Sequence, residues 1–177
     1  YLVTGKPQAV MVHVNVGTTN AMCGLVNAAK GNWPVIFSSG RTPFAEYGNA
    51  EGRRSREIHW PQEMFDQGSM LREFVKWDYE LKSGDVLETA VDRAINMAMS
   101  EPRGPVYLAL PREPLAQQVD KFTYTSPSRR ATPSAPHPDS AAVDQAAELL
   151  AGASSPLIIT ADAGRDPAAM EPLGRLA

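Results

Sequence analysis

Two groups of residues in the first half of the chain have types and spacing that could serve chemistry. The first is the run Gly17-Thr18-Thr19-Asn20, which follows an apolar stretch at residues 8–14. As a turn between a strand and a helix, the run would let a ligand approach Gly17, and Thr18 or Thr19 could cap the helix. Asn20 adds an amide that both donates and accepts hydrogen bonds. By itself, such a run is more often a helix N-cap in a parallel α/β protein than a ligand site.

The second group contains histidines and a glutamine. His13 lies in the apolar stretch, where it is either a neutral core residue or a group facing a ligand at the C-terminal end of the strand. His59 lies in a long loop beside Trp60, where it could line a substrate channel or be an ordinary surface residue. Gln62 in the same loop is a weaker candidate, supported mainly by the neighbouring Glu63.

Basic residues and the one cysteine are expected to have structural roles. The short run Arg53, Arg54 and Arg56 is typical of a solvated face, although it could contact an acidic substrate or a partner subunit. Cys23 is expected to pack on its helix, and a lone cysteine cannot form an internal disulfide. We therefore expect a reducing, cytoplasmic location. We predict no metal ligands in this chain.

The composition restricts the class of protein. The chain has 177 residues, of which 43% are hydrophobic and 21% charged, with a net charge of −3. These values are typical of a globular protein. The charge gives no reason to expect nucleic acid or an anionic membrane as a partner. No apolar run approaches the length of a membrane span.

The elements that must position the candidate residues follow an α/β pattern. Residues 1–4 are predicted to end a helix at Gly5, and residues 8–14 to form a strand buried on both faces. From Thr18, apolar residues at helical spacing then predict a helix that Gly31 ends, followed by a strand at residues 34–39. Such a strand–helix–strand unit requires parallel strands. We therefore predict a parallel sheet with helices on both faces.

Later elements extend the same sheet. Residues 40–70 are irregular, and loops of this length are usually functional or disordered. An alternating pattern at residues 76–81 predicts a half-exposed strand, and Asp85 begins a capping-box helix that ends near residue 100. Residues 106–110 predict another buried strand.

The rest of the chain predicts a second domain. Residues 123–138 are rich in Pro, Ser and Thr and predict a linker, which follows a first domain over residues 1–122. Residues 139–177 predict the start of a Rossmann-like α/β domain: a helix capped by Asp139, a strand at 156–160 and a helix from 170. Because the chain begins inside one element and ends inside another, we expect it to be a fragment of a longer polypeptide.

Four motifs in order resemble the pyrimidine-binding domain of thiamine diphosphate enzymes of the acetolactate synthase type. The resemblance covers residues 1 to about 122. The motifs are Thr4-Gly5-Lys6-Pro7, Gly17-Thr18-Thr19-Asn20-Ala21, Pro61-Gln62-Glu63 and residues 103–111 (RGPVYLALP).

The resemblance implies an enzyme that decarboxylates a 2-oxo acid, such as pyruvate, and transfers or releases the acyl unit. It implies that thiamine diphosphate contacts Gly17, Thr18, Asn20 and Gln62, with His13 and His59 on the substrate side. The family's activating glutamate is expected upstream of Tyr1, so no catalytic residue is expected in this chain. The Mg²⁺ and diphosphate site is expected in a further domain, and FAD binding is left open. A homodimer or homotetramer is also implied, and the chain alone is expected to be inactive.

Two other classes of function remain open at this point. One is a non-catalytic α/β binding or assembly module with the same fold. The other is a nucleotide-binding α/β domain unrelated to thiamine, which is disfavoured because no Gly-x-Gly-x-x-Gly or Walker-type loop follows a predicted strand. A glutamate in the helix before Tyr1 would favour the enzyme, and an apolar residue there would favour the binding module or an unusual enzyme without that glutamate.

Overall fold

The computed structural model describes residues 1–121, 124 and 134–177, which belong to two compact units. The first unit comprises Tyr1 and Val3–Ala135, and Pro136–Ala177 lie in the second. Most of the predicted linker, residues 123–138, lies outside the described residues. None of the helices that the structure describes is long and apolar enough to cross a membrane.

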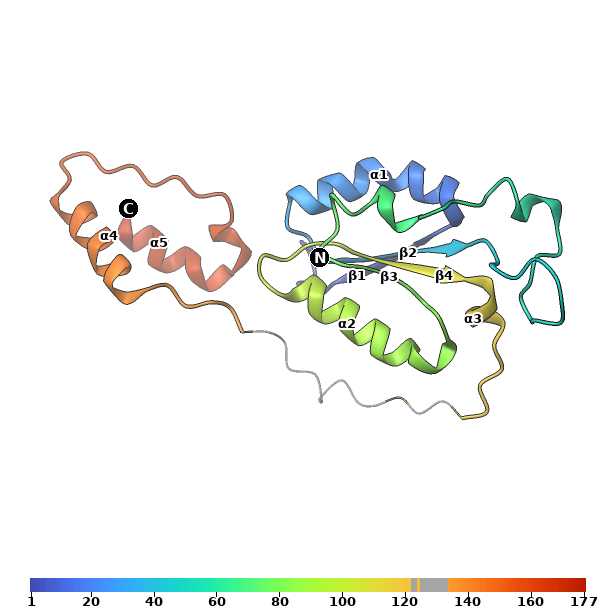
Figure 1. Ribbon diagram of the computed structural model, residues 1–177. Helices are drawn as coiled ribbons and strands as arrows, with labels where there is room; N and C mark the ends of the chain where they lie inside the picture. Colours follow the sequence, from blue (N-terminus) through green and yellow to red (C-terminus); the bar gives the residue numbers. More distant parts are fainter. Residues whose placement is uncertain (122–123, 125–133) are drawn as a thin grey trace. The chain divides into compact units, whose positions relative to one another are not determined.

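The first unit is built on a four-stranded parallel sheet with the strand order β1-β2-β4-β3 (Figure 1). Its two long helices, α1 (Val14–Lys30) and α2 (Leu87–Met99), lie on opposite faces of this sheet. This arrangement confirms the predicted parallel sheet with helices on both faces. The strands are β1 (Gln8–Val12), β2 (Val35–Arg41), β3 (Asp78–Glu80) and β4 (Val106–Pro111).

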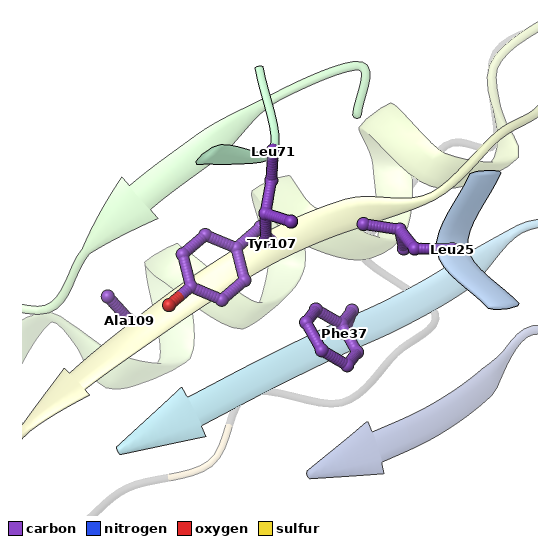
Figure 2. Packing of buried hydrophobic residues seen from close by; sticks show 5 residues of the cluster. All are labelled: Leu25, Phe37, Leu71, Tyr107 and Ala109. Carbon is purple, nitrogen blue, oxygen red and sulfur yellow. The ribbon is translucent and has the colours of Figure 1, made fainter. Parts of the chain in front are cut away.

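Apolar side chains fill both faces of the sheet. Phe37 of β2 lies directly opposite Tyr107 of β4, so both side chains point to the same face of the sheet, and their ring centroids are 5.8 Å apart. The residues next to them in each strand point to the other face. They pack with Leu25 from α1 and with Leu71 (Figure 2). On the other face, Val106 and Leu108 meet the alanines of α2, Ala94 and Ala98. Alanines at a spacing of four residues let the backbone of α2 lie close to the sheet.

β1 is an edge strand, and four of its five residues are exposed. The prediction of a strand buried on both faces is therefore wrong. In the described part of the chain only β2 lies beside β1, so Val10 and Met11 stay accessible despite their apolar side chains. Before it, Tyr1–Thr4 form a single turn rather than helix, closed by a 2.8 Å bond from the Gly5 N–H to the Tyr1 carbonyl. Gly5 has φ +68°, the left-handed conformation expected of a helix-ending glycine.

α1 begins four residues earlier than predicted. Helical structure starts at Val14, with His13 as the N-cap residue, so Gly17 and Asn20 lie inside the helix rather than in a turn. The two threonines donate hydrogen bonds back to carbonyls one turn earlier, Thr18 to Val14 at 2.6 Å and Thr19 to Asn15 at 2.8 Å. Threonine can form such bonds inside a helix and can also cap the N-terminus of a helix. The residue type alone therefore does not determine where α1 begins.

The second half of the sheet unit follows the prediction more closely. The half-exposed strand β3 and the buried strand β4 form where expected, and α2 ends at Met99. The predicted capping box at Asp85 is wrong: Ser83 is the cap, its hydroxyl accepting from the Asp85 N–H at 3.2 Å, and a 3-10 turn, η3 (Gly84–Val86), precedes α2. A short helix, α3 (Arg112–Ala116), follows β4.

The long segment between β2 and β3 contains two 3-10 turns, η1 (Glu57–His59) and η2 (Gly68–Met70). No other helix or strand is assigned between Thr42 and Trp77. The irregular structure predicted for residues 40–70 is confirmed from Thr42 onward, where β2 has ended.

The second unit contains helices but no strand among its residues in the structure. Asp139 caps α4 (Ser140–Gly152) as predicted, accepting from the Ala141 N–H at 3.2 Å. Two 3-10 turns, η5 (Ala163–Arg165) and η6 (Pro167–Ala169), lead to α5 (Met170–Leu176), which confirms the predicted last helix. The strand predicted at residues 156–160 is wrong, because no neighbouring strand is assigned to pair with it.

Candidate functional site

A cavity of about 310 Å³ opens at the C-terminal ends of the parallel strands, and we call it the strand-end pocket. Its lining includes Val12 at the end of β1, Gly40 near the end of β2 and Leu110 near the end of β4. Ligands of parallel α/β sheets gather at this edge, beyond the carboxyl ends of the strands. The position alone therefore marks the pocket as a candidate site.

Three of the residues singled out from the sequence meet in this pocket. His13, His59 and Gln62 all line it, although α1 and β2 lie between His13 and the other two residues in the chain. The fold brings them together because His13 directly follows β1, while the segment carrying His59 and Gln62 follows β2, the neighbouring strand, and lines the same pocket.

The junction between β1 and α1 holds His13 in place. His13 is extended, with φ −90° and ψ 115°, and its carbonyl accepts the Gly17 N–H at 2.7 Å. Val14 follows with φ +34°, a left-handed conformation that is costly for a β-branched residue and persists only where the surroundings enforce it. The Val14 side chain is buried. A Cβ on Gly17 would lie 3.0 Å from the Val12 Cβ, so glycine lets the helix start close to the strand end.

His59 is held as a neutral imidazole with a defined tautomer. The Ser55 N–H donates to its Nδ1 at 3.2 Å, so the ring proton of the neutral form is on Nε2. Partial burial lowers the pKa of His59, and the positive charges of Arg112, Arg54 and Arg56 lower it further, against a smaller opposing effect of Glu113. Nε2–H is therefore the donor that His59 offers near neutral pH.

Two arginines, Arg41 and Arg112, lie among the mainly apolar residues that line the pocket. Arg112 donates from Nη1 to the Ser55 hydroxyl at 3.1 Å and forms no ion pair among the residues that the structure describes. Arg41 also lines the pocket, but its Nε is paired with Glu80 at 2.7 Å. No aspartate or glutamate is among the described lining residues. Arg112 is thus the cation available to a ligand.

Arg54 fixes the wall of the pocket, a role that the sequence did not indicate. Its side chain is only 2% exposed, whereas the basic run was predicted to be solvated. Its Nε donates to the Pro43 carbonyl at 2.9 Å, and its guanidinium pairs with Glu63 and lies 3.5 Å from Glu46. The guanidinium carbon also lies 5.2 Å from the ring centroid of Trp60. One buried cation therefore joins four parts of an otherwise irregular loop.

Gln67 anchors the same loop to the sheet and was also not predicted. It is 2% exposed, and its amide nitrogen lies 2.8 Å from the Ser39 hydroxyl, 3.0 Å from the Gly40 carbonyl and 2.8 Å from the Tyr107 hydroxyl. The two hydroxyls are themselves 2.6 Å apart. A glutamine in an irregular segment carries no periodic signal, so only the folded chain identifies it.

The structure places the cofactor residues expected from the resemblance in different surroundings. Asn20 lines a second, more open hollow of about 480 Å³, which we call the helix-side hollow, together with Asn15, Thr19, Glu63 and Met70. Gln62 lines the strand-end pocket instead, next to Glu63 in sequence. Thr18 is fully buried and lines neither of these two cavities, and Gly17 packs against Val12.

The cysteine and the metal-binding residue types were also considered in the sequence. Cys23 is exposed on α1, so the prediction that it packs is wrong. No cluster of three His, Cys, Asp or Glu side chains able to hold a metal ion occurs in the described ranges.

Comparison with known proteins relates the chain to one family of enzymes. Residues 1–70 match the family described as thiamine pyrophosphate (TPP) enzyme, N-terminal TPP binding domain. Benzoylformate decarboxylase of Pseudomonas aeruginosa is 29% identical over 116 residues, which cover 66% of this chain and 20% of that protein. Oxalyl-CoA decarboxylase of Escherichia coli is 30% identical over 158 residues, covering 88% of this chain and 27% of that protein.

A solved structure shows the same fold. The crystal structure of benzoylformate decarboxylase from Polynucleobacter necessarius has a TM-score of 0.66 and 24% sequence identity, and the match covers 88% of this chain and 27% of that one. The chain thus spans about a fifth to a quarter of the length of these relatives.

Proposed function

We infer the function of this chain from its family: residues 1–70 belong to the N-terminal, TPP-binding domain of thiamine pyrophosphate enzymes. We propose that the chain is the pyrimidine-binding part of an enzyme that decarboxylates a 2-oxo acid and transfers or releases the acyl unit. The observation that carries the proposal is the strand-end pocket, where His13, His59 and Gln62 meet. All three lie within the residues that match the family.

We propose that the helix-side hollow holds the flat ring of the cofactor. Asn20 supplies an amide that can donate to and accept from a heterocycle, and the thioethers of Met64 and Met70 offer polarisable apolar surface. Gln62 would reach the cofactor from the strand-end pocket. Gly17 and Thr18 would act indirectly, by setting the close packing at the start of α1 that orients Asn20. When bound, thiamine diphosphate supplies the nucleophilic carbon and the electron sink for decarboxylation.

The chain's own residues would orient the substrate and move protons. The Nε2–H of neutral His59 can donate to a substrate oxygen, and His13, which is exposed at the pocket, can exchange a proton with it. The apolar lining, including Val12, Val14 and Leu110, limits access of water to the reacting atoms.

Several parts of the proposal concern the complete enzyme. We expect an activating glutamate upstream of Tyr1, a Mg²⁺ and diphosphate site in another domain, and a homodimer or homotetramer in the cytoplasm. Reading the sequence that precedes Tyr1 tests the first of these directly. The 177-residue chain alone should show no thiamine-dependent turnover, because positioning and electrostatic activation provide most of the catalysis.

Calorimetric titration of the complete enzyme with thiamine diphosphate and Mg²⁺ tests the function, and the absence of binding would favour a non-catalytic module. Replacing Asn20 by alanine should weaken binding by roughly 1–3 kcal/mol, the cost of losing a buried hydrogen bond. Asn27→Ala is the matched control, because Asn27 is exposed on the same helix about two turns further on. Equal cofactor affinities of the two variants would remove Asn20 from the site.

A further inference from the structure

The strand-end pocket combines one available cation with a largely apolar lining. Arg112 uses one N–H to donate to the Ser55 hydroxyl, and its guanidinium has further N–H groups that can donate to a ligand. Ser55 links it to His59, because the Ser55 N–H donates to Nδ1 of His59. The two side chains are therefore held by one residue, with the guanidinium and the Nε2–H as their remaining donors.

Apolar side chains at the same pocket are left accessible. Met11 is 62% exposed, Ile58 51% and Leu115 56%, and all three line the pocket. They come from three different elements: β1, η1 and α3. Exposed apolar groups that converge on a cavity containing a few polar groups are typical of a small-molecule site.

We propose that the strand-end pocket binds the substrate as a monocarboxylate with an apolar substituent. Arg112 and the His59 Nε2–H hold the carboxylate, and Met11, Ile58 and Leu115 contact the substituent. The claim that the bound acid is a substrate rests on the function proposed above. The claim that the pocket binds such an acid is independent of that function.

The charge of the pocket selects one carboxylate rather than a polyanion. Of the two arginines that line it, Arg41 is already paired with Glu80, which leaves the charge of Arg112 alone. A single guanidinium matches a single carboxylate in charge and in geometry. A phosphate ester or a dicarboxylate would bring a second negative charge that no available cation in the described lining would balance.

Binding can be measured on the 177-residue chain without cofactor. The probe is 4-methyl-2-oxopentanoate, and the signals are the imidazole resonances of the three histidines, followed by NMR as a function of pH. The charges that set the pKa of His59 in the unliganded chain are Arg112, Arg54, Arg56 and Glu113. A carboxylate bound beside His59 stabilises its protonated form, so binding should raise the pKa of His59 and leave the resonances of exposed His137 unperturbed.

Two comparison ligands separate the two parts of the proposal. The neutral amide of the same acid should bind about tenfold or more weakly, because a hydrogen bond to a charged group is lost. Pyruvate keeps the carboxylate but has only a methyl substituent, and should bind roughly tenfold or more weakly because less apolar surface is buried.

Variants of the chain test the named residues. Arg112→Gln should weaken 4-methyl-2-oxopentanoate about tenfold or more, and Arg93→Gln, at an exposed site on α2, should change nothing. Leu115→Ser should weaken 4-methyl-2-oxopentanoate more than pyruvate.

The outcomes distinguish this inference from the proposed function. Equal binding of the acid and its amide, or unchanged affinity in Arg112→Gln, would overturn the carboxylate site even if the complete enzyme binds thiamine diphosphate. Acid binding that raises the pKa of His59 and requires Arg112 would support the site even if the complete enzyme does not bind thiamine diphosphate.

Discussion

The sheet and the loop that covers its C-terminal edge are held together in different ways. The sheet is stabilised by apolar side chains from both faces, such as Leu25 and Phe37 on one and Leu108 on the other. The loop between β2 and β3 is fixed largely by two buried polar side chains, Arg54 and Gln67. The floor of the strand-end pocket thus depends on many interchangeable contacts, and its wall on a few specific ones.

This difference predicts different responses to substitution. Apolar burial is non-directional, so a lost contact lowers the free energy of unfolding without moving particular groups. A buried guanidinium has fixed donor directions, and losing it leaves its partners unpaired and the backbone between them unconstrained. Substitutions in the sheet should therefore change global stability most, and substitutions in the loop should change the pocket.

The largest expected effect is on the sheet. Leu25→Ala should lower the free energy of unfolding by about 3 kcal/mol, because it removes a buried side chain and leaves a cavity. Urea unfolding followed by tryptophan fluorescence measures this, since Trp33, Trp60 and Trp77 all lie in the first unit. The pKa of His59 should not change. Leu149→Ala, at an exposed position of α4, is the control, and an equal loss there would contradict the assignment of Leu25 to the core.

A smaller loss of stability with a larger effect on the pocket is expected at Arg54. Arg54→Met should lower the free energy of unfolding by roughly 1–3 kcal/mol, because half-exposed Glu46 and Glu63 can be solvated when the cation is gone. It should also raise the pKa of His59, since one of the charges that lowers it is removed.

Two control variants sharpen this test. Arg54→Lys keeps the charge but not the forked donors, so it should destabilise the loop while keeping the pKa of His59 low. Arg53→Met changes an exposed neighbour and should leave stability nearly unchanged. If Arg53→Met and Arg54→Met behaved alike, Arg54 would not be the residue that fixes the wall.

Gln67→Leu should have a still smaller effect on stability, about 1 kcal/mol, because Ser39 and Tyr107 can continue to bond to each other. The Gly40 carbonyl would lose its partner at the edge of the pocket. Faster amide hydrogen exchange in residues 60–70, with unchanged exchange in β2 and β4, would show that only the loop is loosened. Faster exchange throughout the sheet would instead make Gln67 part of the global core.

The smallest expected effect is the contribution of His59 to the pH dependence of stability. Its pKa is lower in the folded chain than in the unfolded one, so the unfolded state takes up a proton first as the pH falls. Stability should therefore be full above the ordinary histidine pKa and decrease below it, until the folded pKa is passed. Urea unfolding of His59→Gln at a series of pH values should lack this decrease, and an identical profile would contradict it.

The sequence predicted the order of elements well and the burial of β1 poorly. The helices α1, α2 and α4 and the strands β2 and β4 follow from apolar spacing and from end signals such as Gly31 and Asp139. Burial of β1 and pairing of residues 156–160 depend on what lies beside them, which a local pattern does not contain. An apolar run is thus evidence for extended structure but not for a neighbour.

The candidate site was likewise predicted in part from the sequence and in part only from the fold. His13, His59 and Gln62 were selected from the sequence by residue type and by resemblance, and the position of His13 in the apolar stretch at residues 8–14 suggested that it lies near a strand end. That they line one pocket was decided by the fold, because β1 and β2 are neighbouring strands and residues that follow both of them line that pocket. Arg54 and Gln67 were missed, since a buried polar residue in an irregular segment looks like a solvated one until its partners are known.

By itself, then, the sequence determined most of the local elements, the parallel α/β class and the resemblance to a family, because these depend on spacing along the chain and on motifs in order. The tertiary structure decided where α1 begins, which strand edge is exposed and which polar groups are buried. It also decided that Arg112, His59 and three apolar side chains share one cavity. Those features depend on contacts between residues far apart in the chain, and such contacts exist only when the chain is folded.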